Sequence, residues 1–318
     1  MEILLMILCL VGGFVLLVKG ADYFVDGACA ISAKLKIPAY LVGLTVVALG
    51  TSLPEAAVSV TASIQGSNEI AIGNVIGSNM FNTLVVLGAS ALIAPIMVKR
   101  DILRRDLPFC IGVTILLPVL ILTLNGGDLA LTRLDGIILL VCFVAFMTYS
   151  IISGKKKAAI ETEETSGDAD MSNIKCALYV LLGLAGVIIG GELTVNGAKS
   201  LALLVGLSEN VVALTVVAIG TSLPELVTSV VASRKNQNDL AIGNVIGSNV
   251  FNLLFILGMS ATIGNIGTDM NGVFDACILV GIMLLLGVFA LTRKKISRAE
   301  GVVMVMLYIA YTAYLLLR

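Results

Sequence analysis

Long apolar runs separated by short polar breaks dominate this chain. Each run reaches or exceeds the roughly 18 to 20 residues that an α-helix needs to cross a bilayer. The ten runs lie near residues 3–30, 37–65, 70–98, 107–124, 134–153, 174–203, 206–233, 240–264, 273–292 and 299–317. The pattern therefore predicts an all-α polytopic membrane protein with ten transmembrane helices in a lipid bilayer.

One break differs from the others because it is long, charged and free of aromatic residues. It covers residues 154–173, GKKKAAIETEETSGDADMSN, and its acidic residues lack the spacing of a calcium-binding EF-hand loop. This composition favours a solvated linker. The linker divides the chain into a first five-helix unit at 1–153 and a second at 174–318.

A sequence repeat relates the two units. Residues 44–88 and 214–258 match without a gap at a constant offset of 170, and both copies contain GTSLPE and GNVIGSN. Because an odd number of predicted spans separates the copies, the second copy crosses the membrane in the opposite sense to the first. Two inverted five-helix repeats are the plan of many secondary transporters.

Basic residues concentrate in alternate breaks. Sixteen of the twenty Lys and Arg residues lie at 34–36, 99–105, 155–175, 234–235 and 293–298. Lys and Arg resist translocation, so loops rich in them stay in the cytoplasm. We therefore expect these breaks, including the 154–173 linker, to be cytoplasmic. Both chain termini should lie on the external side of the cell membrane.

The composition narrows the classes of function. Apolar side chains make up 58% of the chain and charged ones 13%, the net charge is −1, and His is absent. A near-zero charge without a basic patch argues against nucleic-acid partners. The lack of His argues against most zinc, haem and Ser-His-Asp chemistry. We expect a protein that is not an enzyme, carries no cofactor and relies on oxygen ligands.

Each copy of GTSLPE predicts a broken helix in the middle of a span. Pro54 cannot donate a hydrogen bond to the carbonyl of Gly50, and Pro224 stands in the same relation to Gly220. Backbone carbonyls left unpaired at membrane depth are tolerated where they line a polar cavity or bind a ligand. A cation is the ligand that such carbonyls suit.

Hydroxyl groups and a carboxylate gather at each break. Glu55 and Glu225 are ionisable residues inside predicted spans, which makes them functional candidates, and we expect them to meet near the midplane. The accompanying polar residues are Thr51, Ser52, Thr221 and Ser222 at the breaks, and Asn74, Ser78, Asn82, Asn244, Ser248 and Asn252 on the following helices. Carboxylate, amide, hydroxyl and carbonyl oxygens suit Ca²⁺ and also Na⁺.

Structural roles compete with this interpretation. The GxxxG pairs Gly73 and Gly77, and Gly243 and Gly247, are more typical of close helix packing than of ligand contact. Asn79 and Asn249 suit hydrogen bonds between helices, and each glutamate alone could pair with Lys19 or Lys199. The joint duplication of proline, carboxylate and hydroxyls nevertheless favours a functional site.

The blocks GTSLPE…GNVIGSNMFN and GTSLPE…GNVIGSNVFN resemble the paired α-repeats of the sodium/calcium exchangers, within the cation/Ca²⁺ antiporter superfamily. The resemblance extends over all ten predicted spans. It implies that Glu55 and Glu225 coordinate Ca²⁺ together with backbone oxygens of Thr51 and Thr221. It also implies Na⁺ sites, whose ligands would be Ser52, Ser78, Asn82, Ser222 and Ser248 with the carbonyls of Ala48 and Ala218.

Departures from relatives refine what the resemblance implies. Some relatives carry Asp where this chain has Asn252, and in the potassium-cotransporting branch that Asp is associated with K⁺. Asn252 therefore argues against potassium dependence and leaves two carboxylates in the site. Proton-coupled relatives tend to have Asn in place of Thr51 and Thr221, so the threonines favour Na⁺. The short 154–173 linker replaces the large regulatory insert of eukaryotic exchangers, as in a minimal prokaryotic exchanger.

The expected function is therefore an antiporter that moves Ca²⁺ out against inward Na⁺ by alternating access, with three Na⁺ for each Ca²⁺. Exchange of Ca²⁺ for H⁺ through protonation of the two glutamates is the alternative within the same class. An intramembrane hydrolase or a channel is the alternative from other classes. GxGD-like hydrolase motifs are absent, and the site is completed within one chain, so we expect no obligate protein partner.

Overall fold

A computed structural model describes residues 2–123, 129–160, 170–206 and 218–317, and nearly all of these are helical. The long unbroken helices are α1 (Glu2–Leu35), α7 (Leu107–Thr123), α8 (Arg133–Ile160), α9 (Asn173–Leu204), α15 (Met270–Arg293) and α16 (Arg298–Leu317). Shorter pieces of the first half, with π-helices marked η, are α2 (Ala39–Val42), η1 (Gly43–Val47), α3 (Ala48–Thr51), α4 (Leu53–Ile64), α5 (Asn68–Phe81), η2 (Asn82–Val86), α6 (Leu87–Ile93) and η3 (Ile102–Asp106). Those of the second half are α11 (Ala218–Gly220), α12 (Leu223–Arg234), α13 (Asn238–Val250), η5 (Phe251–Ile256) and α14 (Leu257–Ile263).

The spans agree with the apolar runs. Eight helical segments of the described residues are long and apolar enough to cross a membrane, and the bent pair Ala39–Thr51 and Leu53–Ile64 forms a ninth. The predicted span at 206–233 is described over α11 and α12, whereas 207–217 lies outside the described residues. The fold is thus that of an α-helical multi-pass membrane protein.

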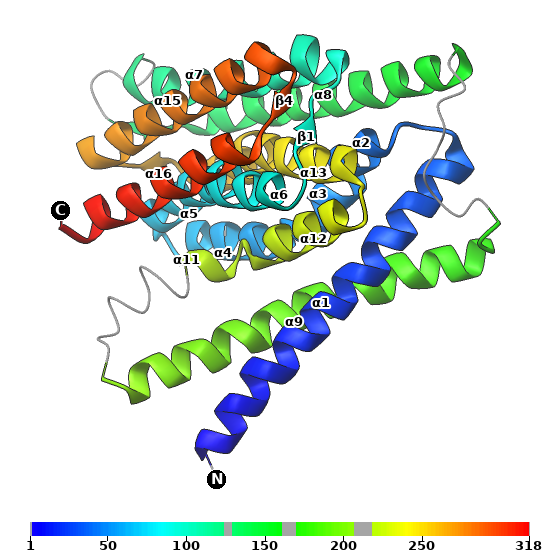
Figure 1. The fold of residues 1–318 in the computed structure, drawn as a ribbon. Helices are drawn as coiled ribbons and strands as arrows, with labels where there is room; N and C mark the ends of the chain where they lie inside the picture. Colours follow the sequence, from blue (N-terminus) through cyan, green and yellow to red (C-terminus); the bar gives the residue numbers. More distant parts are fainter. Residues whose placement is uncertain (1, 124–128, 161–169, 207–217, 318) are drawn as a thin grey trace.

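The helices form three groups (Figure 1). α1 and α9 cross each other along one side of the molecule, and α7, α8 and α15 lie on the opposite side. Between them lie the broken spans, with α4 and α12 on the side of α1 and α9, and α5, α6 and α13 above them in this view. The polar repeats GTSLPE and GNVIGSN are both in this central group, so the two outer groups shield them.

α1 and α9 pack with their backbones in contact. Glycines recur every seven residues on both helices, at 13, 20 and 27 and at 183, 190 and 197. A Cβ atom built on Gly20 would lie 2.6 Å from the backbone of Gly186, and one on Gly13 would lie 2.7 Å from that of Thr194. Small residues let helix backbones approach this closely in membranes. The pairing of residue 13 with 194 and of 20 with 186 shows that the two helices run antiparallel.

The proline breaks occur where the sequence predicts them. α3 ends at Thr51 and α4 begins at Leu53, with a bend of 49° between the two parts of the span. Pro54 and Pro224 lie in the first turns of α4 and α12, where the missing N–H has no helical partner to lose. Each proline therefore starts a new helix in the middle of a span.

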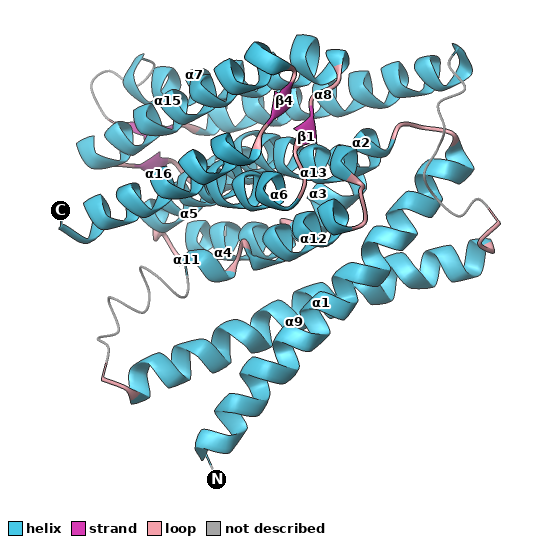
Figure 2. Ribbon diagram, viewed as in Figure 1, coloured by secondary structure: helices cyan, strands magenta, loops and turns pink. Residues whose placement is uncertain are grey.

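Two short antiparallel ribbons cap the bundle (Figure 2) and are not predicted from the sequence. β1 (Ile96–Met97) pairs with β4 (Lys295–Ile296), and β2 (Ala130–Leu131) pairs with β3 (Ile266–Gly267). α15 joins β3 to β4, and its 24 residues span about 36 Å at the rise of an α-helix. The two ribbons therefore lie at opposite ends of the bundle.

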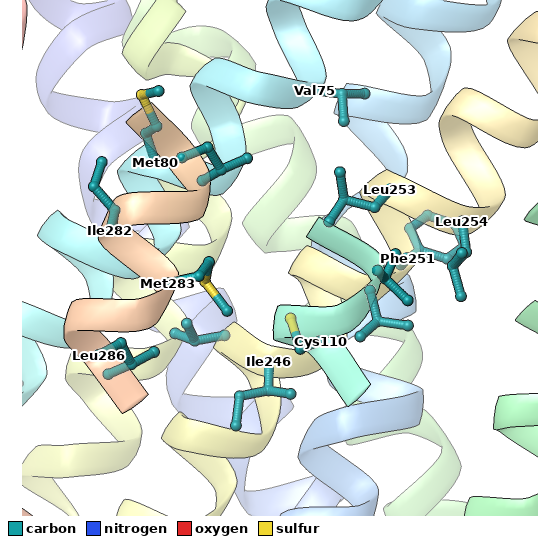
Figure 3. Close-up of a cluster of buried hydrophobic side chains, with 14 of the residues drawn as sticks. Val75, Met80, Cys110, Ile246, Phe251, Leu253, Leu254, Ile282, Met283 and Leu286 are labelled. Atoms are coloured by element: carbon teal, nitrogen blue, oxygen red, sulfur yellow. The ribbon is translucent and has the colours of Figure 1, made fainter. Parts of the chain in front are cut away.

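Apolar side chains from the central group and from α7 and α15 form the main core (Figure 3). Met80, Ile246, Leu254 and Met283 are among its members, and each is at most 2% exposed. By contrast, α16 leaves large apolar side chains such as Val302 and Leu317 exposed. Such side chains suit a lipid environment, and the core beneath them fixes α5 and α13 in place.

Candidate functional site

The two buried glutamates are each held by a serine of the other half. Ser52 precedes α4, makes no capping hydrogen bond with its side chain, and donates through Oγ to Oε1 of Glu225 at 2.8 Å. Ser222 precedes α12 and donates to Oε1 of Glu55, also at 2.8 Å. The two breaks thus exchange hydrogen bonds, and neither half completes its own arrangement.

Both carboxylates lie at the centre of the molecule. Glu55 and Glu225 are 0% exposed, and the two serine hydrogen bonds bring their breaks together. The second oxygen of each, Oε2, has no hydrogen-bond partner among the described residues. Pairing of Glu55 with Lys19 is wrong, because Lys19 lies 4.0 Å from Asp22 and its side chain is 69% exposed. Each glutamate therefore presents one unpartnered carboxylate oxygen, and neither forms an ion pair within the described residues.

The two threonines differ in their surroundings. Thr51 is fully buried, and its Oγ1 lies 3.1 Å from the carbonyl of Val47 and 3.2 Å from Oδ1 of Asn244. Thr221 Oγ1 has no partner among the described residues. Thr221 also lines a cavity of about 550 Å³ whose walls include Pro54, Glu192 and Asn196. Thr221, unlike Thr51, therefore borders this cavity.

Backbone carbonyls at the breaks accept hydrogen bonds, whereas the sequence predicts that some of them are left unpaired. The Ser52 N–H donates to the carbonyl of Ala48 at 3.1 Å, and Thr51 Oγ1 lies 3.5 Å from the same oxygen. In the second half the Ser222 N–H donates to Ile219 instead of Ala218, at 3.2 Å. A carbonyl oxygen has two lone pairs, so Ala48 can still bind a ligand.

Two serines and two asparagines from α5, η2, α13 and η5 complete the buried polar group. Ser78, Asn82, Ser248 and Asn252 are at most 2% exposed. Both serine hydroxyls and Oδ1 of both asparagines have no partner among the described residues. π-Helical segments such as η2 and η5 occur frequently at functional sites, and here they begin at or next to these asparagines.

Asn74 and Asn244 make the same kind of hydrogen bond in the two halves. Each donates through Nδ2 to a serine one turn after the glutamate, Asn74 to Ser59 and Asn244 to Ser229, both at 2.9 Å. They therefore join α5 to α4 and α13 to α12. Sequence reasoning missed these serines, although each follows its glutamate by four residues in both copies.

Close packing explains the second GxxxG pair. A Cβ on Gly243 would meet the carbonyl of Tyr40, and one on Gly247 would meet the carbonyl of Leu44 and lie 2.7 Å from Cβ of Ala48. α13 therefore contacts the backbone of α2, η1 and α3 directly. Among the described residues, Gly73 and Gly77 have no comparable neighbour.

The chemistry of this group suits a hard cation. It offers two carboxylates together with hydroxyl, amide and carbonyl oxygens, which are groups that Ca²⁺ and Na⁺ both accept. Within the described residues no three His, Cys, Asp or Glu side chains converge, as they do at many permanently occupied metal sites. The two acids and many neutral oxygens are consistent with a cation that binds and leaves.

Comparison with known proteins identifies relatives over the whole chain. The family model described as sodium/calcium exchanger protein matches residues 5–152 and 175–317. The putative antiporter CaxA of Alkalimonas amylolytica is 39% identical, over 94% of this chain and 95% of its own. The sodium/calcium exchanger MaX1 of Methanosarcina acetivorans is 32% identical, over 97% of both chains. A solved structure of the sodium-calcium exchanger NCX_Mj, soaked with Na⁺ and Sr²⁺, superposes with a TM-score of 0.85 at 32% identity, covering 97% of this chain and 98% of that one.

Proposed function

Because the chain belongs to the sodium/calcium exchanger protein family, we propose that it exports Ca²⁺ in exchange for Na⁺ across the cell membrane by alternating access. The observation that carries this proposal is the buried pair of Glu55 and Glu225. One oxygen of each is held by a serine of the opposite half, and the other has no partner among the described residues.

The geometry supports a division of ligands between the two ions. Ca²⁺ binds Glu55 and Glu225 with backbone oxygens of Thr51 and Thr221, because two ionised carboxylates neutralise one divalent cation. Na⁺ uses smaller sets of neutral oxygens next to one acid. The proposed Na⁺ ligands are Ser52, Ser78, Asn82, Ser222, Ser248 and Asn252, with the carbonyls of Ala48 and Ala218.

The energetics favour three Na⁺ for each Ca²⁺. A tenfold Na⁺ gradient supplies about 1.4 kcal/mol per ion, and one net charge crossing 100 mV adds about 2.3 kcal/mol. Two Na⁺ exchange without net charge and sustain only about a hundredfold Ca²⁺ gradient. Three Na⁺ supply about 6.5 kcal/mol in total, enough for a gradient of more than about 10⁴. A cell that keeps its calcium far below the external level needs the larger value.

The test is Ca²⁺ uptake into liposomes that contain the purified protein, under separate Na⁺, K⁺ and H⁺ gradients. We expect uptake with the Na⁺ gradient alone and a dependence on membrane voltage. Uptake driven by H⁺ without Na⁺ would show proton coupling instead. Uptake that is indifferent to voltage would contradict the three-to-one ratio.

Two neutral variants test the site itself. Glu55→Gln and Glu225→Gln each remove one of the two charges that bind the divalent cation, so each should abolish Ca²⁺ flux while the protein still purifies as a single species. Glu69→Gln is the matched control, because Glu69 is an exposed acid at the start of α5. Near-normal flux in either site variant would refute the assignment.

A further inference from the structure

A chain of buried amides joins the two halves beside the glutamates. It consists of Asn79 from α5, Asn249 from α13 and Asn252 from η5, together with Thr83 from η2. All four side chains are at most 1% exposed. In such surroundings the direction of each hydrogen bond is constrained, because a reversed amide would face a donor with a donor or an acceptor with an acceptor.

The orientation of Asn79 is fixed by a backbone group. Its Nδ2 donates to the carbonyl of Asn249 at 3.3 Å, and a carbonyl can only accept. Oδ1 of Asn79 is therefore the end that faces Asn252. Nδ2 of Asn252 donates to this oxygen at 3.0 Å.

These hydrogen bonds leave Oδ1 of Asn252 able to accept a further bond. With Nδ2 engaged, Oδ1 is a buried acceptor without a partner in the part of the chain that the structure describes. Ser248, four residues earlier, has an equally unpartnered hydroxyl and lies beside the Glu225 carboxylate. η5, which carries Asn252, packs against α4, the helix that carries Glu55, so the amide oxygen is a candidate member of the buried polar group around the two glutamates.

The corresponding amide of the first half is not held in this way. Asn249 takes the place of Asn79 in the repeat, but its Nδ2 donates to Oγ1 of Thr83 at 2.9 Å. Thr83 replaces the apolar Leu253 of the second copy, and its hydroxyl lies 3.4 Å from the sulfur of Met283. Asn82 consequently has no partner for either Nδ2 or Oδ1 among the described residues.

We propose that Asn79 is a positioning residue that directs the side-chain oxygen of Asn252 towards the transported cation. This inference rests on the proposed function. An ionised Asp at 252 would place a negative oxygen against Oδ1 of Asn79, so the amide at 79 favours a neutral donor opposite it. The site then has one amide whose orientation is fixed by hydrogen bonds, Asn252, and one that has no hydrogen-bond partner among the described residues, Asn82.

Equilibrium binding tests the proposal independently of transport. The concentrations of CaCl₂ and of NaCl that give half of the maximal rise in melting temperature are measured on detergent-purified protein, with choline chloride holding the ionic strength constant. In Asn79→Leu at least one of the two should rise about fivefold, the effect of losing one orienting hydrogen bond. Asn79→Ala is a second variant that removes the same acceptor with less bulk.

The matched control is Asn249→Leu. It removes a buried amide of the same type, together with the bonds to Thr83 and Met283, but leaves the backbone carbonyl that orients Asn79. We expect it to lower the melting temperature without changing either half-saturating concentration. A structural role alone would make Asn79 and Asn249 variants behave alike.

A double-mutant cycle shows whether Asn79 acts through Asn252. In an Asn252→Ala background, Asn79→Leu should produce no further change in cation affinity. The proposal is overturned if Asn79→Leu leaves both affinities unchanged, or if its effect persists in full without Asn252. Failure of Na⁺-driven Ca²⁺ flux in the unmodified protein would instead refute the proposed function, and the binding measurements would still decide the role of Asn79.

Discussion

Replacing Gly247 by Ala tests whether the contact between α13 and the first broken span sets the geometry of the site. The new methyl group would lie 2.7 Å from Cβ of Ala48 and closer still to the carbonyl of Leu44. Ordinary carbon contacts are about 3.5 to 4.0 Å. The two elements must therefore separate by about 1 Å, and such overpacking typically destabilises a protein by about 1 to 3 kcal/mol.

The same shift separates polar side chains that the two elements carry. α13 holds Asn244 and Ser248, and α3 holds Thr51. The 3.2 Å contact between Oδ1 of Asn244 and Oγ1 of Thr51 would lengthen beyond hydrogen-bonding distance. Displacements of about 1 Å at a binding or reacting group can reduce rates about a hundredfold. We expect Gly247→Ala to lower Na⁺-driven Ca²⁺ exchange in liposomes at least about tenfold.

Gly281→Ala is the control for adding a methyl group to a membrane helix. Gly281 lies in α15 and is exposed, and a Cβ there meets no described atom within 4 Å. This variant should exchange Ca²⁺ normally and keep its melting temperature. If Gly247→Ala matched it in both measurements, α13 would be able to move without disturbing the site, and the reasoning from backbone contact would be refuted.

Two further predictions concern the packing of α1 and the topology. Lys235 Nζ lies 2.8 Å from Asp26 and 3.4 Å from Asp22. Partly exposed ion pairs contribute about 0.2 to 1 kcal/mol each and are screened by salt, so Lys235→Gln should lower the melting temperature slightly at low ionic strength and not in 1 M choline chloride. A loss of melting temperature that does not depend on salt would contradict an electrostatic role. Single cysteines at 160 and 268 in a cysteine-free protein should react with an impermeant reagent from opposite sides of the membrane. Residue 160 ends α8, whereas the N–H of residue 268 donates to the carbonyl of Leu129, just before the start of the same helix. External labelling of 160 but not of 268 in whole cells would show the orientation to be inverted.

The repeat made the helical plan and the breaks predictable. A proline, a glycine and an acid at the same offset in two apolar runs specify where each span stops, because these effects act within a few residues. Pro54 and Pro224 accordingly begin new helices as predicted. The expected meeting of Glu55 and Glu225 also follows from inverted symmetry, since equivalent midplane positions face each other.

The hydrogen-bond partners of individual side chains could not be predicted from the sequence. Helical spacing places Asn74 on the same face as Ser78, but the crossing angle of α5 and α4 decides that Asn74 bonds to Ser59. Asn79 and Asn249 are also at equivalent positions of the repeat. The first copy has Thr83 where the second has Leu253, however, and the amide of Asn249 donates to the hydroxyl of Thr83. Contacts between elements depend on packing, which a repeat pattern does not specify.

The exchange of hydrogen bonds between the halves has a consequence for biosynthesis. Ser222, the partner of Glu55, is encoded 167 residues after it, a distance that a ribosome covers in roughly 10 to 30 s. During that interval the first five helices enter the membrane with an acid whose hydroxyl donor has not yet been made. A lone carboxylate at membrane depth is costly, so the nascent first half must keep this region close to water, the insertion machinery or a chaperone until α12 arrives. Premature release of the nascent chain is therefore the step at which quality control would recognise an incomplete molecule.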